Sequence, residues 1–201
     1  DPIPAFVERD REIPVMRDSL TAGYFRQEQN SGLIGIYEHT GAVEAWAPKG
    51  FPEWASESEL FTEDLDRLMP WLGNALERMP VLADAGIKQI FNGAISHTPD
   101  GPPLLGPVAG LKNFWLCCGA SFGIAQGAGC GKYLAQWMLY GDADINMTGL
   151  DPRRFGVFAD DPYLRSTVFQ DYCNTFVTPL PSEELPAGRA QRTSPLYETL
   201  K

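Results

Sequence analysis

The feature that most constrains this chain is the stretch 113–140, which joins a short apolar run, a glycine-rich turn and a helical pattern. The apolar run 114–118 is too short for a helix and is typical of a buried strand in a parallel sheet. After the turn, apolar residues recur at helical spacing, at Ile124, Ala128, Leu134, Trp137 and Met138. The stretch therefore predicts a strand, a tight turn and a helix, in that order.

Glycines gather where this helix begins, at Gly123, Gly127, Gly129 and Gly131. A glycine lets another backbone or a ligand come close, and the first N–H groups of a helix are unpaired and carry a partial positive charge. An electron-rich ligand group therefore suits the helix start. The same spacing also fits a glycine-packed helix against a sheet with no ligand, and the residues alone leave both interpretations open.

The composition narrows the class of protein. With 201 residues, of which 44% are hydrophobic, the chain suits one domain or two small ones. The net charge of −10 argues against nucleic acid and anionic membrane surfaces as partners, and no apolar run approaches membrane-spanning length. The chain opens on Asp1 and Pro2 rather than Met, so we expect a piece of a longer polypeptide.

The four cysteines show no metal-binding spacing, and no metal site is expected. Cys117 and Cys118 are adjacent in the apolar run, and we interpret them as packed thiols rather than as metal ligands or disulfide partners. Free thiols of this kind fit a reducing compartment.

A β-hairpin is predicted near the N-terminus. Residues 22–28 alternate in character, residues 29–32 have turn chemistry, and residues 33–37 return as an apolar strand. Period-two spacing places Tyr24, Arg26 and Glu28 on one face. An aromatic ring, a cation and a carboxylate on one face suit a polar site, but a solvated sheet face fits the residues equally and is favoured on spacing alone.

The other predicted elements are mainly structural. Residues 62–79 form the clearest amphipathic helix, which Pro70 should kink or split. We also predict a strand over residues 87–95 and a helix over residues 162–176, with a linker-like tail over residues 178–201. Residues 39–59 read as a long loop with aromatic anchors at Trp46, Phe51 and Trp54.

His97 is one of only two histidines and precedes a Thr-Pro-Asp turn. Histidine serves as an acid or base near neutral pH, so a catalytic role is one interpretation. A local hydrogen-bonding role beside the turn is the interpretation we favour.

Five motifs in order give the chain a family likeness that covers nearly its whole length. They are YFRQE at 24–28, TPDGPPLLGP at 98–107, GASFGIAQGAGCGKYLAQW at 119–137, LDPRRFG at 150–156 and AGRAQRTSPLYETL at 187–200. Together they resemble the C-terminal half of the flavin region in D-amino-acid-oxidase-like FAD-dependent oxidoreductases, in the dimethylglycine and sarcosine dehydrogenase branch. The GxGxxG motif that binds ADP in this family is not in the chain.

The resemblance implies a fold of the α+β or α/β class with three parts. Residues 1–100 would form the antiparallel sheet of a substrate domain, and residues 101–149 the returning strand and helix of a Rossmann-like FAD domain. Residues 150–201 would connect to a folate-binding domain that is not present. A fragment of this kind is not expected to hold FAD, or to be active, by itself.

The resemblance also implies a function, oxidative demethylation of an N-methylated glycine of the dimethylglycine or sarcosine type. Its cofactor would be FAD, with tetrahydrofolate on the missing half and an electron-transfer flavoprotein as acceptor. The location would be the bacterial cytoplasm or the mitochondrial matrix. An amine oxidase that uses O₂, or a non-catalytic module that has lost flavin, are the alternatives.

Site residues are carried over by motif. Tyr24 would face the substrate amine, and Arg26 would meet a substrate carboxylate. Amino-acid oxidases of the family place an arginine just before the TPD-like turn, where this chain has Ala94, Ile95 and Ser96, so oxidation of free amino acids is less expected. The electron-rich edge of the flavin would meet the helix start, formed by Ser121, Phe122, Gly123, Ile124 and Ala125.

Overall fold

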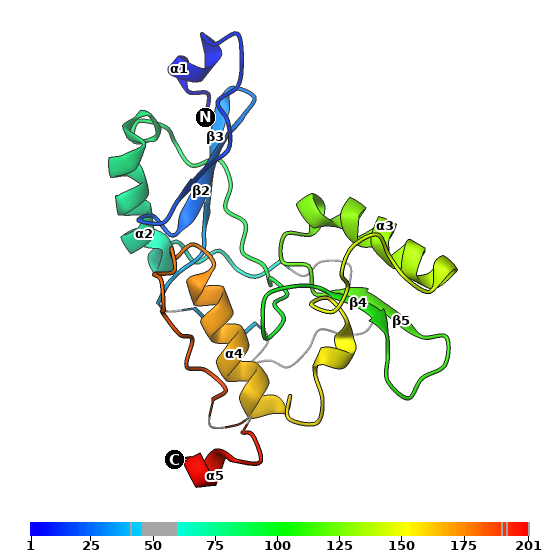
Figure 1. The fold of residues 1–201 in the computed structure, drawn as a ribbon. Coiled ribbons are helices and arrows are strands. Elements are labelled where there is room, and N and C mark those ends of the chain that lie inside the picture. Colours follow the sequence, from blue (N-terminus) through cyan, green and yellow to red (C-terminus); the bar gives the residue numbers. More distant parts are fainter. Residues whose placement is uncertain (41, 46–59, 190, 192, 201) are drawn as a thin grey trace. The chain divides into compact units, whose positions relative to one another are not determined.

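The computed structural model describes residues 1–40, 42–45, 60–189, 191 and 193–200, and it divides the chain into two compact units. The first unit contains Asp1–Ala94 and Tyr172–Glu183, and the second contains Ile95–Asp171 and Glu184–Lys201. Helices and small antiparallel sheets make up both units, as the mixed class predicts (Figure 1). The Rossmann-like arrangement and the roles assigned to residues 1–100, 101–149 and 150–201 stay predictions.

The first unit is built on a three-stranded antiparallel sheet in the order β1 (Met16–Asp18), β2 (Gly23–Glu28), β3 (Ser31–Ile36). This confirms the hairpin, and Tyr24 lies opposite Gly35 in its register. The connection is a two-residue turn, in which Gln29 takes a φ of +52°. Along β2 the alternation is as predicted, since Phe25 and Gln27 are buried whereas Arg26 and Glu28 are exposed.

Helix α2 (Leu65–Arg78) covers this sheet and agrees with the predicted amphipathic helix. It begins after Asp64, whose carboxylate accepts a hydrogen bond from the Arg67 N–H at 3.2 Å. Pro70 lies within the helix and does not split it. The core between helix and sheet also takes residues from the short helix α1 (Pro4–Val7) and the 3₁₀ turn Pro80–Leu82, and comprises Ile3, Phe6, Phe25, Ala75 and Leu82.

The strand predicted over residues 87–95 is wrong. Among the described residues this segment makes only an isolated antiparallel bridge, between Gly93 and Leu60. Its apolar residues Ile87 and Phe91 are 60% and 64% exposed, so no sheet face buries them. The loop predicted around Trp46, Phe51 and Trp54 lies outside the described residues.

In the second unit, β4 (Leu104–Pro107) pairs with β5 (Trp115–Cys118) and α3 (Gly123–Tyr140) packs on the pair. The predicted strand, turn and helix are confirmed, but the pairing is antiparallel rather than parallel. A short connection between consecutive strands favours the antiparallel arrangement, because a parallel pair needs a long crossover. The core of this unit contains Leu105, Cys130, Leu134 and Met147.

Two further expectations for β5 are wrong. Its side chains are half-buried at Trp115 and Leu116, so it is not a fully buried strand among the described residues. Cys117 and Cys118 are exposed rather than packed.

The chain continues through a 3₁₀ turn (Pro152–Arg154) into α4 (Asp161–Asn174), close to the predicted helix, and ends in the single-turn helix α5 (Tyr197–Leu200). The last residues of α4 belong to the first unit. In the tail, the Ala187 N–H donates to Gln170 Oε1 at 3.1 Å, which ties this part of the tail to α4. Among the described residues, none of the helices combines the length and apolar character that a membrane crossing requires.

Candidate functional site

The start of α3 is open. Ser121 and Phe122 form the turn before it, and Gly123, Ile124 and Ala125 are its first residues. No side chain among the described residues caps this end, and Ile124 is fully exposed. The first N–H groups of the helix therefore point at space rather than at a protein acceptor.

The glycines of α3 do not serve packing among the described residues. A Cβ atom built on Gly123, Gly127, Gly129 or Gly131 would meet no heavy atom within 4 Å. The interpretation of a glycine-packed helix against a sheet is therefore wrong for this part of the chain. Open backbone donors with no side chain over them fit the electron-rich edge of a flat ring such as that of FAD.

The TPD turn contacts the backbone segment that leads into the start of α3. Thr98 is 3% exposed, and its hydroxyl donates to the Pro102 carbonyl at 2.8 Å. Its methyl group lies against Gly119, where an added Cβ would come within 2.7 Å. Gly119 also takes a φ of +72°, which favours glycine. The turn thus fixes the backbone two residues before Ser121.

The LDPRRF motif is joined to the same turn. Arg154 donates to both carboxylate oxygens of Asp100, at 2.8 and 2.9 Å, and to the Pro102 carbonyl at 2.8 Å. Its side chain is only 13% exposed. A bidentate pair of this kind fixes direction as well as distance. The TPD turn and the LDPRRF motif, which are separate in the sequence, are therefore held together in the fold.

A small pocket of about 290 Å³ lies beside the first turns of α3. Ala125 is the one predicted cofactor residue that lines it. Gln126, also in the lining, has a buried side-chain carbonyl oxygen with no hydrogen-bond partner in the described structure. A buried acceptor of this kind is suited to a ligand donor. Gln126 was not among the residues predicted from the sequence, although it directly follows the predicted helix start 121–125.

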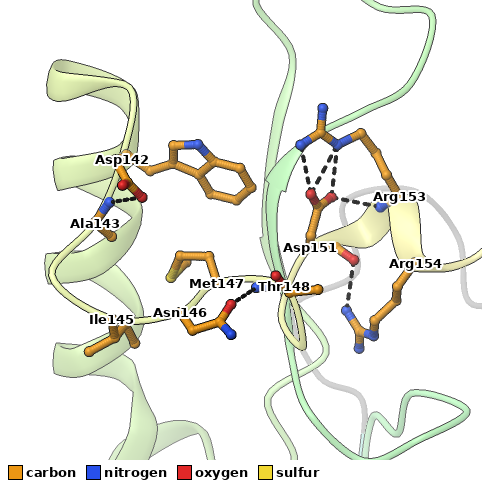
Figure 2. A pocket seen from close by; sticks show the side chains of 10 residues that line it. Asp142, Ala143, Ile145, Asn146, Met147, Thr148, Asp151, Arg153 and Arg154 are labelled. Atoms are coloured by element: carbon orange, nitrogen blue, oxygen red, sulfur yellow. Dashed lines mark hydrogen bonds and ion pairs between the residues drawn. The ribbon is translucent and has the colours of Figure 1, made fainter.

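A larger pocket of about 690 Å³ lies at the other end of α3 and contains none of the predicted site residues (Figure 2). Burial raises the pKa of Asp151, but hydrogen bonds from Arg153 outweigh it, and the pKa is lowered overall. Figure 2 shows that Arg153 faces Asp151 directly, so the two charges compensate each other.

The predicted substrate residues lie on β2 in the first unit. Tyr24 is half-buried, and its ring stacks on Phe176 with a centroid distance of 6.5 Å and an interplanar angle of 21°. Arg26 forms an ion pair with Glu28 at 2.6 Å, and the side chains are 45% and 52% exposed. Such surface pairs contribute little, typically up to about 1 kcal/mol, so a substrate carboxylate can compete for Arg26.

A buried polar cluster that was not expected from the sequence lies next to Tyr37, whose ring is 5.8 Å from that of Tyr172 and 6.5 Å from that of Tyr24. Glu38 has a side chain 5% exposed, accepts a hydrogen bond from the Tyr172 hydroxyl, and lies 3.1 Å from Arg67 Nε. Its partners are 134 and 29 positions away in the sequence, so no local pattern could reveal them.

His97 is held by a carboxylate. Its Nδ1 lies 2.8 Å from Asp171 Oδ2, and its side chain is 3% exposed. The ring nitrogen is hydrogen-bonded, but its partner lies 74 positions away on α4 rather than in the adjacent turn, so the interaction is not the local one that we favoured. Among the described residues, no group of three or more His, Cys, Asp or Glu side chains could hold a metal ion.

Comparison with known proteins gives the family. The family model described as FAD dependent oxidoreductase matches residues 1–137, and that of the FAD dependent oxidoreductase central domain matches residues 140–194. The chain is 37% identical to mitochondrial dimethylglycine dehydrogenase of Mus musculus over 203 residues, 99% of this chain and 23% of that protein. It is 33% identical to mitochondrial sarcosine dehydrogenase of Homo sapiens over 199 residues, 96% of this chain and 21% of that protein.

A third relative is named as a regulatory subunit rather than as an enzyme. The mitochondrial pyruvate dehydrogenase phosphatase regulatory subunit of Mus musculus is 32% identical over 192 residues, 93% of this chain and 21% of that protein. The chain thus spans between a fifth and a quarter of the length of these relatives. Together with the resemblance in the motifs, the match over residues 1–137 shows that the chain belongs to the FAD dependent oxidoreductase family.

Proposed function

We propose that this chain is part of an FAD-dependent enzyme that oxidatively demethylates an N-methylated glycine of the dimethylglycine or sarcosine type. The observation that carries the proposal is the open, uncapped start of α3 in a chain of this family. The similarity to dimethylglycine and sarcosine dehydrogenases supports the substrate class.

FAD, when bound, accepts the hydride equivalent that leaves the carbon next to the substrate nitrogen. The N–H groups of Gly123, Ile124 and Ala125 would donate to the electron-rich edge of the ring and stabilise negative charge there. Ser121 and Phe122 would shape the turn that aims them. Each such donor is worth about 3 kcal/mol where water is excluded.

The substrate would be held by the first unit. Tyr24 would orient the amine and help to keep it neutral, since only a neutral amine has a lone pair to assist hydride loss. Arg26 would exchange Glu28 for the substrate carboxylate. No arginine occupies positions 94–96, which favours an N-methylated glycine over a free amino acid.

The proposal extends to partners and location. Electrons would pass to an electron-transfer flavoprotein, and the one-carbon unit to tetrahydrofolate on another part of the polypeptide. The names of the relatives favour the mitochondrial matrix as location. Anaerobic turnover with the electron-transfer flavoprotein, without hydrogen peroxide release in air, distinguishes this dehydrogenase from an oxidase that uses O₂.

The test is Gly123→Leu in the flavin-containing protein, with Gly73→Leu as the control. Neither position has a heavy atom within 4 Å of an added Cβ, so both variants should fold. We expect Gly123→Leu to lower flavin occupancy or the rate of flavin reduction by dimethylglycine or sarcosine, and Gly73→Leu to change neither. Equal occupancy and rates in wild type and Gly123→Leu would refute the role of the helix start.

A non-catalytic regulatory module is the second candidate, because one relative is named as a regulatory subunit. The absorbance spectrum of the purified complete protein separates the two. Bleaching of bound flavin on addition of dimethylglycine or sarcosine supports the enzyme. Flavin that is absent, or that neither amine bleaches, supports the regulatory module.

A further inference from the structure

The ring of Tyr24 is confined on two sides within the first unit. On one side is Gly35, where an added Cβ would lie 2.1 Å from Tyr24 Cε1 and 2.6 Å from its hydroxyl oxygen. On the other side is Phe176, which is 4% exposed and stacks on the Tyr24 ring. The orientation of Tyr24 therefore depends on where Phe176 is held.

Phe176 follows the end of α4, and three contacts anchor that segment to the sheet region. The Arg17 guanidinium on β1 lies 4.6 Å from the centre of the Phe176 ring and donates to the Thr175 carbonyl. His39 Nδ1 lies 3.1 Å from the Cys173 carbonyl oxygen. The third anchor is the hydrogen bond from the Tyr172 hydroxyl to Glu38.

The third anchor is the one with a buried charge. An ionised carboxylate that is 5% exposed is costly unless it is paired, and Glu38 has both Tyr172 and Arg67 as partners. Burial, with the hydrogen bond to Glu38, raises the pKa of Tyr172, so its hydroxyl stays protonated and remains a donor. Removal of the hydroxyl would leave Glu38 with one partner fewer.

Ring contacts connect this anchor to Tyr24. The Tyr37 ring lies 5.8 Å from that of Tyr172, 5.0 Å from that of Phe176 and 6.5 Å from that of Tyr24. A shift of Tyr172 can therefore reach Tyr24 through the rings of Tyr37 and Phe176, because close-packed side chains transmit displacements to their neighbours.

We propose that Glu38 and Tyr172 are positioning residues that set the orientation of Tyr24 toward the substrate amine. They act through the end of α4 and Phe176 and do not touch the substrate. This inference rests on the proposed role of Tyr24, and no sequence motif of the chain assigned a role to Glu38 or Tyr172.

The first test is a double-mutant cycle on flavin reduction by dimethylglycine or sarcosine in the flavin-loaded protein. It compares Tyr24→Phe, Tyr172→Phe and the double variant, with the exposed Tyr140→Phe as the control. We expect Tyr172→Phe to slow reduction about three- to tenfold in the wild-type background and to add no further loss in the Tyr24→Phe background. Independent losses that multiply in the double variant would overturn the inference, because a general structural role would act regardless of the residue at 24.

A conservative variant provides a rescue within the same experiment. Glu38→Gln keeps an acceptor oxygen for the Tyr172 hydroxyl, whereas Glu38→Ala removes it. We expect Glu38→Gln to reduce flavin faster than Glu38→Ala, and equal rates would count against the hydrogen bond as the anchor.

A second measurement requires no turnover. With 3-fluorotyrosine at position 24 of the 201-residue chain, Tyr172→Phe should change the ¹⁹F chemical shift or line width, and Tyr140→Phe should not. An unchanged ¹⁹F signal in Tyr172→Phe overturns the inference whatever the substrate is. A changed signal, combined with unchanged flavin reduction in Tyr24→Phe, supports the positioning contact and instead refutes the catalytic role proposed for Tyr24.

Discussion

Arg154 donates two hydrogen bonds, of 2.8 and 2.9 Å, to the carboxylate of Asp100, although 54 positions separate the two residues in the sequence. The pair joins the TPD turn to the 3₁₀ turn Pro152–Arg154, and the Arg154 side chain is 13% exposed. The TPD turn in turn supports Gly119, just before the open start of α3. The salt bridge thus stabilises the TPD turn, which contacts Gly119 just before the candidate flavin site.

The first prediction concerns this salt bridge. Arg154→Lys keeps the charge but cannot make the bidentate contact, so we expect the free energy of unfolding to fall by about 1 to 2 kcal/mol. Arg153→Lys is the control, because its partner Asp151 lies two residues away and its side chain is 51% exposed. Urea denaturation of both variants measures the difference. A loss in Arg153→Lys as large as that in Arg154→Lys would contradict the prediction.

The second prediction compares two glycines that differ in surroundings. Gly35→Ala places a Cβ against the Tyr24 ring, so we expect a loss of about 1 to 3 kcal/mol in the free energy of unfolding. Gly73→Ala, in the middle of α2 with no heavy atom within 4 Å of the Cβ, should gain about 0.5 to 1 kcal/mol. Changes of the same sign in the two variants would contradict the close contact between position 35 and the Tyr24 ring.

The third prediction separates backbone strain from steric contact. Gly119 and Gly110 both have a positive φ, of +72° and +79°, but only Gly119 faces a neighbour, Thr98. Both Ala variants should therefore lose about 1 kcal/mol from backbone strain, and Gly119→Ala should lose more. Adding Thr98→Ser removes the contacting methyl group and keeps the hydroxyl, so it should recover part of the loss in Gly119→Ala. Thermal unfolding of the three variants provides the comparison, and equal losses at 110 and 119 would exclude the contact with Thr98.

The fourth prediction concerns pH. The hydrogen bond from Arg78 is the main reason that the pKa of Asp18 is lowered, and the Nε–Oδ2 distance is 2.7 Å. A carboxyl whose pKa is lower in the folded state stabilises the protein above its unfolded pKa, near 3.9, and this contribution is lost as pH falls through the folded value. Asp18→Asn should therefore be less stable than wild type at pH 6, with a difference that shrinks below about pH 4.

The measurement for this fourth prediction is the urea midpoint of wild type and Asp18→Asn from pH 2 to 7. Arg78→Gln, which removes the donor but leaves the carboxyl, should show the same shrinking difference. A gap between wild type and Asp18→Asn that stays constant over this pH range would rule out the linkage.

The hairpin and α2 were predictable because their determinants are local. Alternation along 22–28, turn residues after it, and an apolar stripe ending near Met79 each report on the few residues around them. The face shared by Tyr24, Arg26 and Glu28 followed from period-two spacing in the same way. Local order was therefore enough to group the candidate substrate residues.

Other features were not predictable because they depend on distant partners. The apolar run 114–118 indicates a strand, but its partner and direction are set by β4, and the sequence did not show that Cys117 and Cys118 would be exposed. The failed strand over 87–95 has apolar residues but, within the described part of the chain, only the single bridge from Gly93 to Leu60. The buried pairing of Glu38 with Tyr172 could be found only from the fold, because 134 positions separate the two residues.

The division of the chain also limits how it can be dissected. The backbone passes between the two units three times, after Ala94, after Asp171 and after Glu183. A single cut at any peptide bond therefore yields at least one product in which a unit lacks part of its sequence. Truncation or recombination with one breakpoint can keep one unit whole only together with part of the other, so it never yields either unit both complete and alone.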